Sequence, residues 1–160
     1  MIIKFDDIND DSRIWIFQSN VPLDDDSIDQ LKNKINTFLT TWTAHGNQLK
    51  ASIKIKYNIF LIIALDNTLG EATGCSIDKL ISFIKSIEKE YQIRLLDRLD
   101  ISYKVGQNIV IERLNEFKKK ILTKQVDYST IVFNNLIKLK RDMSDKWEVS
   151  ASESWHKKLF

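Results

Sequence analysis

The feature that most constrains the fold is an unbroken apolar run, Ile59–Leu65. It is far shorter than the roughly 20 residues that a membrane-spanning helix needs, and its β-branched residues are typical of a strand. Successive side chains of a strand point to opposite faces of a sheet, so a run without polar residues needs both faces covered. We therefore expect this segment to be a central strand with further chain packed on either side.

The flanking segments show the periodicities of helices and strands. Apolar residues at helical spacing predict two long amphipathic helices, at residues 28–42 and 74–91. Short alternating or β-branched runs predict strands at residues 13–18, 52–57, 101–105 and 109–113, with the last two joined as a hairpin. The tail is expected to contain a short helix from residue 114, a strand at 130–133 and a helical segment at 136–143.

The order strand, helix, strand, strand, helix, strand predicts an α+β, ferredoxin-like fold, in which two helices cover one face of an antiparallel sheet. We expect one domain over residues 1–160, with residues 1–12 as a frayed acidic N-terminus. Residues 114–160 are expected to form a C-terminal extension that packs on the core and covers the other face of the sheet. In this arrangement Trp147 and Trp155 are largely buried.

Charge is distributed unevenly along the chain, although the net charge is only +2. Residues 1–30 contain eight aspartates and two basic residues, whereas residues 113–160 contain eleven basic and six acidic residues. The acids interrupt the basic end, so a solvated surface is expected and nucleic acid is not the expected partner. The start of the chain lacks the pattern of a secretory signal, and one cysteine cannot form an internal disulfide. These features predict a soluble, cytoplasmic protein that does not bind membranes.

The first candidate for chemistry is Cys75, at the expected start of the second long helix. The positive end of a helix dipole favours a thiolate. Chain direction in the ferredoxin-like arrangement brings His45 and Asp66 to the same rim, where His45 would act as the base and Asp66 would orient its ring. The structural alternative is simpler: free cysteines are commonly buried, and we expect this thiol to be buried and inert.

Other polar residues are candidates for a binding site. They are Gly74, Ser76, Asp78, Asp97, Arg98, Asn134, Asn135, Trp155 and His156. Structural roles are the alternative, with an Asp97–Arg98 ion pair fixing its loop and the two asparagines satisfying backbone groups of a turn. No His or Cys spacing typical of a metal site occurs, so neither a metal nor a cofactor is expected.

Five short segments of this chain resemble a family of short, uncharacterised bacterial proteins, chiefly of the Bacteroidetes type. The segments are Trp42-Thr-Ala-His45-Gly46, Gly74-Cys-Ser-Ile-Asp78, Leu96-Asp-Arg98, Thr130-Ile-Val-Phe-Asn-Asn135 and Ser154-Trp-His156. The resemblance spans nearly the whole chain. Such proteins are often labelled "ABC transporter ATPase", but the resemblance implies neither a substrate nor catalytic residues.

Two functions from different classes follow from these patterns. The favoured one is a non-enzymatic interaction or adaptor domain, because a ferredoxin-like sheet is often a binding platform and no complete catalytic set is visible. Its partner would be an unknown protein or a second copy of the chain. The alternative is a small cysteine-dependent hydrolase or redox protein that uses Cys75, His45 and Asp66.

We predict that the protein neither binds ATP tightly nor hydrolyses it. A phosphate-binding loop needs two correctly spaced glycines followed by Lys and a hydroxyl residue, whereas Gly74 is followed by Cys75 and Ser76. Phosphate release with magnesium–ATP and titration calorimetry test this prediction. Hydrolysis that co-elutes with the protein through two different chromatographic steps would contradict it.

Overall fold

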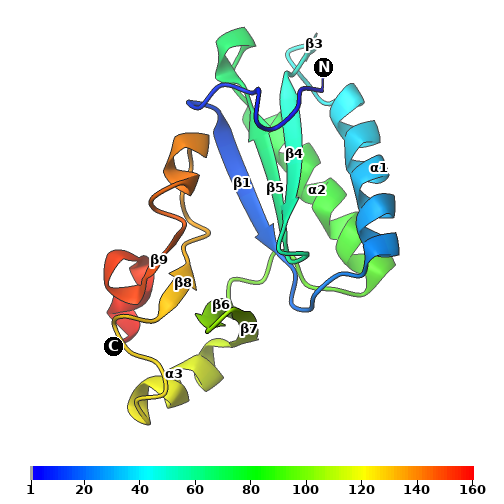
Figure 1. The fold of residues 1–160 in the computed structure, drawn as a ribbon. Helices are drawn as coiled ribbons and strands as arrows, with labels where there is room; N and C mark the ends of the chain where they lie inside the picture. The colour runs from blue at the N-terminus through cyan, green and yellow to red at the C-terminus, as the bar shows by residue number, and fades with distance from the viewer. Residues whose placement is uncertain (1) are drawn as a thin grey trace. The chain divides into compact units, whose positions relative to one another are not determined.

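The computed structural model describes residues 2–160 and combines helices with antiparallel sheets (Figure 1). The chain is α+β, as predicted. It divides into two compact units. Unit 1 contains the chain up to Leu96 together with Lys138–Arg141, and unit 2 contains Asp97–Ile137 and Asp142–Phe160. A single domain over the whole chain stays a prediction.

Unit 1 is built on an antiparallel sheet of three strands in the order β1-β5-β4. The strands are β1 (Arg13–Gln18), β4 (Ala51–Lys56) and β5 (Phe60–Leu65). Every residue of β5 is fully buried, which confirms that the apolar run is a central strand with both faces covered.

Two long helices pack against this sheet, α1 (Asp25–Thr41) and α2 (Gly74–Tyr91). The Asp24 carboxylate caps α1 by accepting a hydrogen bond from the Ser27 backbone N–H at 2.7 Å. A reciprocal capping box between Thr73 and Ser76 begins α2. The buried residues of both helices form one core cluster with Leu61, Ile63 and Leu65 of β5.

Unit 2 contains a second antiparallel sheet, in the order β7-β6-β8-β9. The strands of this sheet are β6 (Asp100–Val105), β7 (Asn108–Arg113), β8 (Ile131–Phe133) and β9 (Glu148–Ser150), and the helix α3 (Leu114–Leu122) follows β7 in the chain. The predicted hairpin, short helix and tail strand are therefore present. The helix expected at 136–143 is reduced to a 3-10 turn, Lys140–Met143.

The sheet that the ferredoxin-like prediction requires is not formed as expected, because β6 pairs with β7 and β8 instead of β1. The place beside β1 is taken by residues 138–141, where Leu139 makes an antiparallel bridge to Arg13. The Ile14 N–H also donates to the Lys138 carbonyl at 2.9 Å. Periodicity identifies a strand but carries no information about which neighbour it pairs with, and this is why the sequence assigned the wrong strand to this edge.

The N-terminal segment, expected to be frayed, instead packs within unit 1. Ile8 is buried, and Lys140 Nζ donates to the Ile8 carbonyl at 2.6 Å. The backbone N–H of Ile3 donates to the Ala51 carbonyl of β4 at 3.0 Å. Apolar residues between the aspartates anchor this segment. The prediction of a frayed N-terminus considered its acidic composition and not these apolar residues.

The two tryptophans of the tail differ in burial. Trp147 is buried as expected, and its indole N–H donates to Asn135 Oδ1 at 2.9 Å. Trp155 is only half-buried. The packing of residues 114–160 over the face of the unit 1 sheet opposite the helices stays a prediction.

Candidate functional site

The three predicted catalytic residues lie on segments that meet at one end of unit 1. β5 finishes there at Leu65, immediately before Asp66, whose N–H donates to the Lys50 carbonyl at 2.9 Å. The indole N–H of Trp42, at the end of α1, donates to the Ser76 carbonyl at 2.8 Å. His45 is exposed in the tight turn between β2 (Thr43–Ala44) and β3 (Asn47–Gln48).

Cys75 is exposed, contrary to the expectation that it is buried. It is the second residue of α2, whereas the next residue, Ser76, is the one that fills the buried position at this helix start. The small side chain that the packing requires is therefore supplied by Ser76. The thiol of Cys75 is accessible to solvent.

Asp66 is buried, and its carboxylate is used within its own loop. Its Oδ1 accepts hydrogen bonds from the Thr68 N–H at 2.9 Å and the Thr68 hydroxyl at 2.7 Å, and its Oδ2 lies 3.3 Å from Lys50 Nζ. Burial alone would raise the pKa of Asp66, but the bonds from Thr68 and the Lys50 ammonium outweigh it and lower this pKa. These contacts cap the 3-10 turn Asn67–Leu69. Both oxygens are thus engaged by Thr68 and Lys50, and a catalytic role of Asp66 stays a prediction.

The other candidates at the start of α2 divide into one structural residue and two exposed ones. Ser76 Oγ accepts a hydrogen bond from the Thr73 N–H at 2.7 Å and donates to the Thr73 carbonyl at 2.9 Å. Gly74, the first residue of the helix, and Asp78, its fifth, are exposed. Ser76 therefore holds the helix start together.

Asp97 forms an ion pair, but its partner is Arg113, not the predicted Arg98. Arg113 Nη1 lies 2.9 Å from Asp97 Oδ2 and 3.1 Å from Asp100 Oδ1. Asp100 and Arg113 are directly opposite in the β6–β7 register, which places the guanidinium at the start of the hairpin. Arg98, adjacent in sequence, is exposed.

The two asparagines after β8 have the structural role expected of turn residues. Asn134 Oδ1 accepts a hydrogen bond from the Leu136 N–H at 3.2 Å. Asn135 Oδ1 accepts the Trp147 indole N–H. Both side chains stabilise the local fold of unit 2.

His156 lies in an aromatic cluster of unit 2 and is only 1% exposed. Its Nδ1 is 2.6 Å from Ser154 Oγ, and the Trp155 ring stacks on it with 4.0 Å between ring centroids. The ring of Phe117 approaches it edge-on. Burial lowers the pKa of His156 to about 4, because the charged form loses its hydration. The residue is a buried neutral part of the core, without the solvent access that ligand binding needs.

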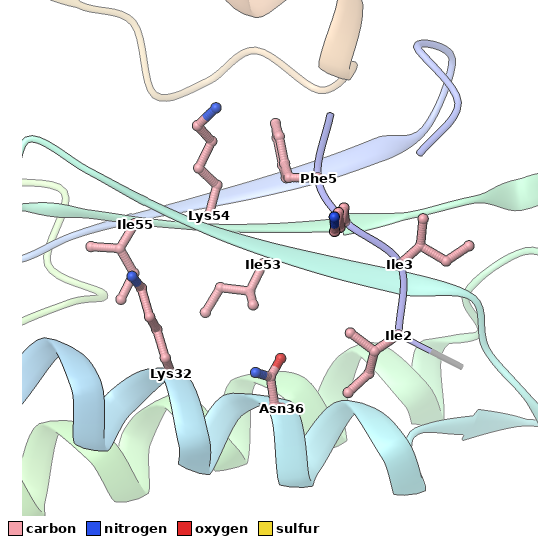
Figure 2. Close-up of a pocket in the computed structure, with 9 residues that line it drawn as sticks. Ile2, Ile3, Phe5, Lys32, Asn36, Ile53, Lys54 and Ile55 are labelled. Atoms are coloured by element: carbon pink, nitrogen blue, oxygen red, sulfur yellow. The ribbon is translucent and has the colours of Figure 1, made fainter. Parts of the chain in front are cut away.

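Sequence reasoning missed a groove of about 430 Å³ in unit 1, between α1, β4 and residues 2–5. Figure 2 shows Ile2 and Ile53 extending toward α1, with Asn36 rising from the helix between them. Lys54 and Phe5 lie on the opposite side of β4. The floor of the groove is thus apolar and its borders are polar.

The outer edge of β4 is open along this groove. Ala51 presents its carbonyl to Ile3 on this edge, and backbone groups alternate in direction along a strand, so Ile53 and Ile55 present their N–H and C=O groups there too. Within residues 2–160 no backbone partner follows Ile3 on this side. The alternating pattern of residues 52–57 had predicted a half-exposed strand. It could not show that the strand lies at an edge.

Two further properties distinguish the groove. Lys4, Lys32 and Lys54 line it, and none of its lining residues is acidic. Asn36 Oδ1 is buried and has no hydrogen-bond partner among the residues that the structure describes. A hydrogen-bond acceptor and three lysines therefore line the groove, and one of these lysines, Lys54, is paired with Asp6 outside the lining.

Comparisons with protein-family models, with curated proteins and with solved structures found no match. Across the part of the chain that the structure covers, no helix has the length and apolar character needed to cross a membrane. The same residues contain no cluster of three or more His, Cys, Asp or Glu side chains able to hold a metal ion.

We predict that His156 makes the protein less stable in mild acid. Its pKa of about 4 in the folded state lies below the ordinary value of 6.5, so the unfolded chain binds the proton more tightly. The stabilisation is complete above about pH 6.5 and is lost as the pH falls toward 4, at a total cost of about 3 kcal/mol. Urea unfolding of the wild type and of His156→Gln, compared between about pH 4.5 and 7.5, measures this difference.

The variant should show the weaker pH dependence, whatever its absolute stability. His45→Gln, at the exposed histidine, is the matched control and should retain the wild-type slope. Parallel curves for the wild type and His156→Gln would contradict the prediction.

Proposed function

We propose that the protein is a non-enzymatic interaction domain that binds an extended segment of a partner protein along the outer edge of β4. The observation that carries this proposal is that the outward backbone groups of Ile53 and Ile55, above an apolar groove, have no backbone partner within residues 2–160. Folded proteins usually cover or block such an edge, because it is a template for pairing with another strand. Addition of a strand supplies backbone hydrogen bonds, and the groove supplies contacts for alternate side chains.

The occupied carboxylate of Asp66 supports a non-enzymatic role. Catalysis by a cysteine–histidine pair needs a third group that orients the imidazole. The contacts of Asp66 with Thr68 and Lys50 serve the fold of its loop instead. The rim is thus better explained by helix and turn capping than by catalysis.

Two finer statements about the chain are part of this proposal. Unit 1 is a ferredoxin-like core in which residues 138–141 stand in the place of the fourth strand, supported by the order β1-β5-β4 and by the bridge from Leu139 to Arg13. The protein is a cytoplasmic member of the short bacterial family that it resembles, and it is not an ATPase. Sequence patterns are the support for this second statement.

We expect extended peptides to bind at β4. Three peptides of about nine residues, alternating valine with glutamate, glutamine or lysine, are titrated into the isotopically labelled protein while its backbone amide NMR signals are followed. At least one peptide should shift the signals of Ile53 and Ile55 and protect their amides from hydrogen exchange. No change at β4 with any of the three peptides at millimolar concentration would refute the proposal.

Ile53→Pro is the blocking variant for this experiment. The Ile53 N–H faces away from β5, so proline removes a donor from the open edge without removing a β4–β5 hydrogen bond. The circular dichroism spectrum should remain that of the wild type, and the peptide-induced shifts should disappear.

The alternative function is a cysteine-dependent enzyme, and the exposure of Cys75 favours it. We expect iodoacetamide to modify Cys75 in the native protein without denaturant, because the thiol is accessible. We also expect His45→Ala to leave the rate of modification unchanged between about pH 6 and 9, because the acid needed to orient His45 is engaged elsewhere. Rapid modification near pH 6 that slows in His45→Ala would favour the enzyme over the interaction domain.

A further inference from the structure

We infer that the segment bound at the β4 edge alternates apolar and acidic residues, with the apolar side chains facing α1 and a carboxylate facing Lys54. This inference rests on the proposed function and identifies the chemistry of the partner. It follows from how side chains alternate on the two faces of β4.

When a strand is added to β4, the position of each of its residues opposite β4 decides the face of the sheet to which that side chain points. Side chains directly opposite each other in neighbouring strands lie on the same face of the sheet. Ile53 and Ile55 are partly buried and pack against the core cluster on the helix side, whereas Lys54 lies on the other face of the strand (Figure 2). Partner residues opposite the two isoleucines therefore point toward α1, and the residue between them points toward Lys54.

The α1 side of the groove selects apolar side chains. Ile2, Ile53 and Ile55 provide the apolar contacts there, and Lys32 stands at the border. The buried, unpartnered Oδ1 of Asn36 adds one acceptor for a partner donor within the same groove. A charged partner residue buried over these isoleucines would exchange its hydration for contact with apolar side chains, which is unfavourable.

The Lys54 side selects a carboxylate. Lys54 Nζ already lies 3.3 Å from Oδ1 of Asp6, whose side chain is 86% exposed. The position thus accepts a carboxylate in the free protein, and the partner's acidic residue competes with Asp6 for it. The next residue on this face of β4, Lys56, extends the same preference along the strand.

Charge also argues against a second copy of this chain as the occupant. Antiparallel pairing of two β4 strands would place Lys54 and Lys56 of both copies along one shared edge. Like charges on facing strands destabilise the pair. The charges favour a different, acidic chain as the partner.

The test compares the acidic, neutral and basic alternating peptides by fluorescence anisotropy at low and high salt. We expect the acidic peptide to bind about three- to tenfold more tightly than the neutral one and the basic peptide most weakly, with the difference shrinking at high salt. Lys54→Gln should weaken the acidic peptide by about two- to fivefold and leave the neutral peptide unchanged. Lys79→Gln, at an exposed lysine of α2 that does not line the groove, is the matched control.

Peptide backbone methylation tests the strand pairing without altering the protein. Two versions of the acidic peptide carry N-methyl groups on alternate amides, on one edge of the extended strand or on the other. Only one edge can face β4, so one version should lose binding and the other should retain it. Equal binding by both would overturn strand addition at this site.

The outcomes separate this inference from the function on which it rests. Equal affinity for acidic and neutral peptides at β4 would overturn the acidic partner and leave the interaction domain standing. Absence of binding by every peptide would overturn both. A concentration-dependent dimer in sedimentation that Ile53→Pro abolishes would assign the β4 edge to a second copy and overturn the inference.

Discussion

The complete burial of β5 is the constraint on which unit 1 depends. Its six residues have no exposed surface, so both faces and both edges of the strand must be occupied. β1 and β4 occupy the edges by antiparallel pairing. α1 and α2 cover the face that carries Leu61, Ile63 and Leu65. Both edges of β5 are therefore hydrogen-bonded, whereas β1 and β4 each have an outer edge that β5 does not pair.

The outer edges of β1 and β4 differ in how they are paired, and this difference is the basis of the proposed function. β1 is paired by residues from late in the chain, through the bridge from Leu139 to Arg13 and the bond from Ile14 to Lys138. Among residues 2–160, the outer edge of β4 pairs with the N-terminal segment at Ala51, through the bridge to Ile2 and the bond from Ile3. Within the described part of the chain, Ile53 and Ile55 have no backbone partner on this edge, which lies next to apolar surface, a combination that favours strand addition.

Most of the polar residues that the sequence offered as candidates for a functional site have structural roles. Asp66, Ser76 and Asn134 each satisfy backbone groups at a turn or helix start. His156 is enclosed by aromatic rings and held neutral by burial. Cys75 and His45 remain exposed, but the acid that would complete a catalytic set is bound to Thr68 and Lys50. The unpaired backbone of β4 within residues 2–160, not side-chain chemistry, is therefore the feature on which the proposed function rests.

The sequence by itself determined the elements that local periodicity encodes: the buried strand at residues 59–65, the two long helices and the β6–β7 hairpin. Spacing of apolar residues reports which face of a segment is buried, and this information is local. Tertiary structure alone decided which strand lies beside β1, which arginine pairs with Asp97, and that the outer edge of β4 is open. Each of these depends on residues that are distant in the chain. The hydrogen-bonding groups of a strand edge belong to the backbone, which is the same in every sequence, so the pattern of side chains does not show whether an edge is open.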